Sequence, residues 1–154
     1  MTSTYDEIIG VFLSKVTDPD FVSFSEETVL QLMQDWIHTA CQNKYVRSIF
    51  SYIRPNDADK TVLFELKYLD EDENSDKDFV CDLIARGMVV AWLDPKVKSI
   101  ANINQMFGTK ESKFYSQSSH LKEIRALLDD EKASIRKIVC DYSYMNNSYL
   151  KGDD

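Results

Sequence analysis

The stretch from Glu111 to Tyr142 constrains the fold most strongly, because it reads as one long amphipathic helix. It contains neither proline nor glycine, and its apolar residues recur at steps of three and four, which is the spacing of one helical face. At the standard helical rise the stretch spans about 48 Å, whereas a compact domain of this length has a radius of gyration of only about 15 Å. We therefore expect part of this face to need a neighbour, as in an assembly protein. The face consists of Leu121, Ile124, Leu128, Ile135, Ile138 and Tyr142, and Glu131 interrupts it.

Apolar faces with helical spacing also predict helices over Tyr5–Val16, Val29–Cys41 and Phe79–Trp92. Thr4 and Ser25 precede the first two helices and are good N-cap residues. The third face covers more than half of its helix, so we expect this helix to be central.

Proline and glycine mark the expected boundaries. Asp94-Pro95 predicts that the third helix ends there and that a short fourth helix runs from Val97 to Phe107, with Gly108 as its stop. The segment Arg54–Asp57 reads as a turn.

The β content should be small. Val62–Leu69 alternates apolar and polar residues and predicts a strand, while Tyr45–Ile53 fits either a helix or a strand. The fold class is thus mainly α, a bundle of four to five helices with a long C-terminal helix and at most a small β element near residues 62–69. Residues 1–142 should form a single helical domain, followed by a tail over 143–154.

The C-terminal end is unusually aromatic for a free tail. Two interpretations stay open: the segment folds back on its own domain, or it docks on another subunit or partner, where tyrosines are favoured. The candidate interface residues are Tyr142, Tyr144, Met145, Asn146, Asn147, Tyr149 and Leu150.

The net charge of −8 is concentrated in one segment, because ten acidic residues and three lysines lie between Asp57 and Asp82. Such a chain is a poor general binder of nucleic acid. The segment is either a solvated loop or an acidic surface facing DNA or a basic partner, where repulsion would prevent DNA from sticking. The candidate DNA-channel residues are Asp70, Glu71, Asp72, Glu73, Asp76 and Asp78.

No catalytic or cofactor motif is visible. His38 and His120 are isolated, and glycine-rich phosphate loops and metal-ligand spacings are absent from the sequence. Asp70, Asp72 and Asn74 resemble the start of a calcium loop, but the required glycine and closing glutamate are missing. We expect no enzyme activity, no catalytic residues, no cofactor and no metal.

The cysteines and the chain termini add little. Cys41, Cys81 and Cys140 lie in apolar helical patterns and are expected to be buried free thiols. No apolar run reaches the length of a membrane span, and the N-terminus lacks the features of a signal peptide. We expect a protein made in the cytoplasm, with no membrane partner.

Two blocks, Trp92–Val97 (WLDPKV) and Lys113–Glu123 (KFYSQSSHLKE), resemble small head–tail connector proteins of tailed phages of Gram-positive bacteria, also called adaptor or neck proteins. The opening helix around Tyr5–Ile9 and the ending Asp141–Asn147 are similar to that family as well.

The resemblance implies a mainly helical virion protein in the neck, made in the host cytoplasm. Such proteins assemble as rings, commonly dodecamers, below the portal protein and extend the DNA channel toward downstream neck and tail proteins. They bring no cofactor, and their contact with DNA is non-specific proximity in the channel. The alternatives are a tail-completion or terminator protein, or a small acidic regulatory protein that binds a host factor.

Overall fold

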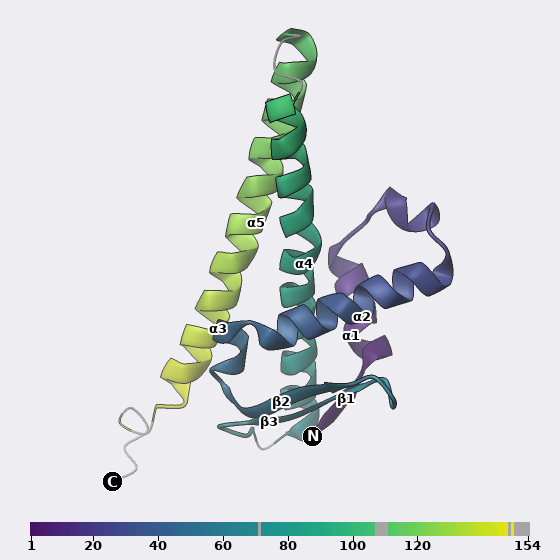
Figure 1. Cartoon of the computed structure of the whole chain (residues 1–154). Coiled ribbons are helices and arrows are strands. Elements are labelled where there is room, and N and C mark those ends of the chain that lie inside the picture. Colours follow the sequence, from purple (N-terminus) through teal and green to yellow (C-terminus); the bar gives the residue numbers. More distant parts are fainter. Residues whose placement is uncertain (71, 107–110, 148, 150–154) are drawn as a thin grey trace.

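The computed structural model describes the backbone of residues 1–70, 72–106, 111–147 and 149, and the side chains in these ranges other than residues 19, 20 and 100–118. The fold is mainly α, as predicted, with a long C-terminal helix and one small antiparallel sheet (Figure 1). In chain order the elements are β1 (Thr2–Thr4), α1 (Tyr5–Lys15), a 3-10 helix (Pro19–Val22), α2 (Glu26–Gln42), α3 (Lys44–Arg47), β2 (Phe50–Asn56), β3 (Thr61–Leu66), α4 (Glu73–Met106) and α5 (Glu111–Met145).

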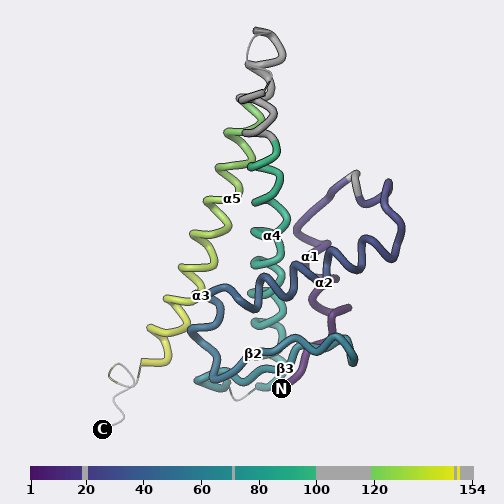
Figure 2. Tube along the Cα trace, viewed as in Figure 1, coloured from purple at the N-terminus to yellow at the C-terminus, as the bar shows by residue number. Residues whose placement is uncertain are grey.

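Helices α4 and α5 run antiparallel as a long hairpin that extends well beyond the rest of the molecule (Figures 1 and 2). The predicted stripe of α5 faces α4, and Ile124, Leu128 and Ile135 are buried there. The neighbour that the long helix required is therefore α4 of the same chain, so helix length by itself does not call for a partner protein. Glu131 interrupts the stripe because it pairs with Arg86 of α4 at 3.1 Å.

The predicted break at Asp94-Pro95 is wrong, because α4 continues through Pro95 to Met106. A proline inside a helix loses one backbone hydrogen bond and crowds the preceding turn. Tertiary contacts hold the helix on both sides of it: Leu93 is buried, and Trp92 Nε1 donates to Asp18 Oδ2 at 2.7 Å. Lys96 binds the same carboxylate at 2.9 Å. Gly108, the expected stop, lies outside the described residues.

The sheet has the order β1-β3-β2, with both pairs antiparallel. The predicted strand is present as β3, but the turn expected at Arg54–Asp57 is wrong, since β2 runs through Pro55 to Asn56. Strand β2 lies at the edge of the sheet, where proline is tolerated because one side of the strand needs no hydrogen bonds. The chain turns immediately afterwards, and Lys60 adopts a positive φ of 52°.

The other deviations come from short elements. Strand β1 spans three residues, too few for an alternating pattern, and a four-residue 3-10 helix spans Pro19–Val22. The expected helix starts are confirmed: Thr4 forms a capping box with Glu7, and the Ser25 hydroxyl accepts a hydrogen bond from the Thr28 amide.

Helix α2 passes in front of α4 in Figure 1, and the two helices touch at Gly87 and Ala40. A Cβ atom added to Gly87 would lie 2.6 Å from the Ala40 Cβ and 3.1 Å from its Cα. Fully buried side chains surround this crossing, including Ile37, Ile84 and Met88. Because the helix backbones approach so closely, this interface leaves no room for a larger residue.

Candidate interaction surface

The hairpin opens at its lower end, where the start of α4 and the end of α5 move apart (Figures 1 and 2). Between them lies a hollow of about 680 Å³, which we call the α4–α5 groove. Its wall combines aromatic and aliphatic side chains with carboxylates. The lining residues are Tyr68, Leu69, Asp70, Ser75, Asp76, Phe79, Ile138, Asp141, Tyr142, Met145 and Asn146.

Tyr142 lines this groove and contacts both α4 and the loop before it. Its ring stacks on Phe79 of α4, with ring centroids 5.3 Å apart and planes 15° from parallel. Its hydroxyl donates to the Tyr68 carbonyl and accepts from the Tyr68 amide at 3.2 Å. Partial burial raises the pKa of the Tyr142 phenol. For this residue the structure selects the first of the two interpretations, because the ring packs on its own domain.

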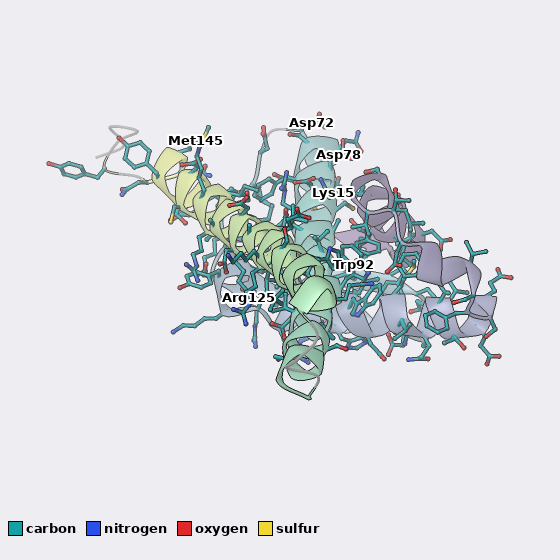
Figure 3. All side chains as sticks on the ribbon, turned by 90° about the horizontal axis from the view of Figure 1, so that it is seen from above. Lys15, Asp72, Asp78, Trp92, Arg125 and Met145 are labelled. Carbon is teal, nitrogen blue, oxygen red and sulfur yellow. The ribbon has the colours of Figure 1, made fainter. Side chains whose placement is uncertain are left out.

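The residues after Tyr142 are placed differently. Tyr144, Met145 and Tyr149 are 67%, 71% and 91% exposed, and Met145 marks the far end of α5 in Figure 3. Two amides in this segment serve local structure: Asn146 Nδ2 donates to the Tyr142 carbonyl, and Asn147 Oδ1 accepts from the Tyr149 amide.

Leu150, the last of the predicted interface residues, lies outside the described residues. Leu69, across the groove, was not predicted and is 64% exposed. An apolar surface therefore borders the groove on both sides.

The predicted acidic segment divides into two groups. Asp70, Asp72, Glu73 and Asp78 are exposed at the start of α4, where Asp72 Oδ1 accepts a hydrogen bond from the Asn74 amide. Asp76 is only 6% exposed, and its Oδ2 accepts from the Asp70 amide at 3.0 Å. Asp76 thus fixes the loop before α4 and cannot serve as an outward channel residue. Glu71 lies outside the described residues.

A second hollow of about 450 Å³ adjoins the groove on the sheet side and shares Leu69, Asp70 and Asp76 with it. Glu65 and Glu73 add carboxylates to this hollow, and Lys77 pairs with Glu73 at 3.3 Å. Among the described residues, no lysine, arginine or histidine lines either hollow. Met1 lines the smaller hollow, and its amine donates to the Phe64 carbonyl. The surface is therefore apolar with an acidic border.

A basic surface that the sequence reading missed lies on the other side of α5. We call it the basic flank, and it consists of Lys44, Arg47, Arg125, Lys132 and Arg136. The α5 members follow one another at steps of seven and four, so they share one side of the helix. Arg136 lies over the Tyr45 ring of α3 at 5.1 Å. Asp129 is an acidic residue on the same side of α5 as the basic flank. In Figure 3, Arg125 lies across α5 from Asp72 and Asp78.

A polar cluster joins the β2–β3 turn to two helices. Asp57 accepts hydrogen bonds from Tyr5 Oη at 2.5 Å and lies 2.9 Å from His38 Nε2. These bonds, with Tyr5 the largest contributor, lower the pKa of Asp57. Burial and the Asp57 carboxylate raise the pKa of Tyr5. The sequence left His38 isolated, because its partner lies 19 residues away.

The prediction of buried free thiols is right for Cys41 and Cys81 and wrong for Cys140. Cys41 and Cys81 are buried, and burial raises the pKa of the Cys41 thiol to about 12. Cys140 is exposed, because it lies beside the buried stripe of α5 rather than within it. Across the part of the chain that the structure describes, no group of three or more histidine, cysteine, aspartate or glutamate side chains is arranged to hold a metal ion.

No described helix combines the length and the apolar composition needed to cross a membrane. No protein-family model, no curated protein and no solved structure matches this chain.

Proposed function

We propose that this protein is a structural virion protein of a tailed phage, a head–tail connector that forms a ring below the portal protein and extends the DNA channel. The observation that carries the proposal is the exposed apolar end of α5 beside the α4–α5 groove. Exposed apolar surface next to a hollow with polar borders is typical of protein–protein contact sites.

The position of this surface supports an assembly role. Tyr144 and Met145 extend from a long helix whose other side is fixed against α4. Both residues lie within α5, so their backbone is already helical and little backbone entropy is lost when a partner covers them. Tyrosine and methionine are also among the residues enriched in interfaces.

The exposed carboxylates at the start of α4 are proposed to face the DNA passage. Asp70, Asp72, Glu73 and Asp78 belong to this wall, whereas buried Asp76 does not. Like charge keeps the DNA backbone from adsorbing to a surface that it must slide past. Replacing Asp72 and Asp78 by lysine should keep the fold and impair packaging or ejection of the genome. Normal infectivity of that virus would remove the channel assignment.

The connector role is tested by negative-stain microscopy and mass measurement of the purified protein, alone and mixed with the portal protein of the same virion. We expect a ring stacked on the portal. The double variant Tyr144→Ser/Met145→Ser should fold normally and fail to join the complex. Leu13→Ser/Leu30→Ser provides the matched control, because those exposed apolar residues lie on α1 and α2. Absence of any portal complex with the unmodified chain would contradict the role.

A further inference from the structure

We propose that the α4–α5 groove of one copy binds the basic flank of a second copy, so that copies of this chain associate head to tail. The inference rests on the proposed function, because it assigns two specific surfaces to self-association within the ring. The observation that carries it is that one chain presents two complementary surfaces and cannot bring them together itself.

The two surfaces border the buried stripe of α5 from opposite sides. Ile138, Asp141 and Tyr142 line the groove on one side of Ile135 and Val139, and Lys132 and Arg136 lie on the other side. At about 100° per residue, Asp141 of the groove points about 140° away from Arg136 and about 180° away from Lys132. They cannot meet within one molecule, but each is available to a neighbour.

Charge determines which surface of a second copy can bind in the α4–α5 groove. The net charge of the chain is −8, so an arbitrary part of a second copy would be repelled by Asp141 and the other carboxylates of the groove. The basic flank carries the opposite charge: four of its five members are exposed, and none forms an ion pair with a described residue. Opposite charges at an interface select the partner and its orientation.

The apolar parts of the two surfaces also fit. Tyr45 is 48% exposed beneath Arg136 and offers an aromatic face. Leu69 and Met145 present exposed aliphatic and thioether surface at the edge of the groove. Arginine and tyrosine are the side chains most often found at the energetic centres of interfaces.

The geometry makes the contact heterologous, since different surfaces meet. Heterologous contacts close into rings when the rotation between copies permits it and otherwise continue as filaments. A symmetric pair would instead place groove against groove, with Asp141 of one copy near the carboxylates of the other. Electrostatics disfavours that arrangement.

The test is a charge exchange on full-length protein, with association measured by sedimentation over a wide concentration range. Asp141→Lys places lysine opposite the basic flank, and Arg136→Glu places glutamate opposite the groove. Each variant alone should associate at least about tenfold more weakly than the unmodified chain. The double variant D141K/R136E should recover association, and an equal mixture of the two single variants should associate in alternation.

Two control variants test whether the effect is specific to the groove and the basic flank. Asp130→Lys and Lys137→Glu reverse exposed charges elsewhere on α5 and should leave association unchanged; circular dichroism confirms that each variant is folded. An unmodified chain that stays monomeric at every concentration overturns the inference, as does a double variant that stays as weak as the single ones. If Asp141→Lys instead abolishes binding to the portal protein and leaves self-association intact, the groove takes a different basic protein. In that case the head-to-tail contact is wrong while the proposed function stands.

Discussion

The two sides of α4 show how differently one helix can be packed. Toward α2 the contact is closed, with Gly87 against Ala40 and buried aliphatic side chains on every side. Toward α5 the contact is closed where Arg86 pairs with Glu131 and Leu128 is buried, but it opens into a hollow of about 680 Å³ lined by Phe79 and Tyr142. The closed side fixes the fold. The open side leaves apolar and acidic surface available for binding.

The comparison separates stability from function along one element. Substitutions on the α2 side should change the free energy of unfolding, and substitutions in the groove should change association more than folding. Two measurements below challenge this division, and a third concerns the β2–β3 turn; they are ordered from the largest expected effect to the smallest.

Replacing glycine by alanine should have opposite effects on stability at Gly87, which lies in the contact between α2 and α4, and at Gly10, which does not. Gly87→Ala places a methyl group 2.6 Å from the Ala40 Cβ, and we expect a loss of about 2 kcal/mol in unfolding free energy because the backbones must separate. Gly10→Ala has nothing within 4 Å of the new atom and should gain about 0.5–1 kcal/mol from helix propensity. Urea unfolding of both variants measures the difference.

A double-mutant cycle sharpens the result. Ala40→Gly added to Gly87→Ala removes the overlapping methyl group and should restore part of the lost stability, since the two residues are in direct contact. Equal stabilisation by alanine at both glycines would show that α2 and α4 are less tightly packed than described.

Two truncations divide the end of α5 at Tyr142. Deleting residues 143–154 should leave unfolding free energy nearly unchanged and should remove assembly, because Tyr144 and Met145 are exposed. Deleting residues 142–154 also removes the ring stacked on Phe79 and bonded to Tyr68, so it should cost a further 1–2 kcal/mol, roughly. Thermal and urea unfolding of the two proteins give the difference, and equal stabilities would show that the Tyr142 contacts contribute nothing.

The smallest expected effect is a pH dependence at the β2–β3 turn. The raised pKa of Tyr5 means that the fold favours its neutral phenol. That stability is complete below the unfolded pKa of about 10 and is lost as pH rises above it. The lowered pKa of Asp57 acts on the other limb, where stability is lost as pH falls below about 3.9.

Tyr5→Phe should therefore flatten the alkaline limb of a stability–pH curve, and Asp57→Asn should flatten the acid limb. Tyr149→Phe, at a 91% exposed ring, is the matched control. An unchanged alkaline limb in Tyr5→Phe would show that the Tyr5–Asp57 bond does not contribute to stability in solution.

Sequence reasoning found the elements whose signals are local. Side-chain periodicity located α1, α2 and α5, and the caps at Thr4 and Ser25 marked two starts correctly. It failed at Pro95, where contacts of Trp92 and Lys96 with Asp18 keep the helix intact. Those contacts join residues 74 or more positions apart, so no local rule reveals them.

The surface around the α4–α5 groove was predicted only in part, because many of its contacts join residues that are far apart in the sequence. The aromatic end of α5 was visible as composition, but the stacking of Tyr142 on Phe79 depends on how the hairpin closes. Asp76 looked like any other acidic loop residue until the fold buried it against the Asp70 amide. The basic flank could have been found, because Arg125, Lys132 and Arg136 repeat at steps of seven and four.

Amide hydrogen exchange of the full-length chain, compared between dilute and concentrated solution, tests the division between the closed and open sides of α4 most directly. We predict that exchange slows on association at residues 68–70 and 141–147 around the groove and at residues 44–47 of α3, while the α2–α4 crossing at residues 84–88 is equally protected in both states. Slower exchange confined to the α2–α4 crossing, with an unchanged groove, would contradict the account.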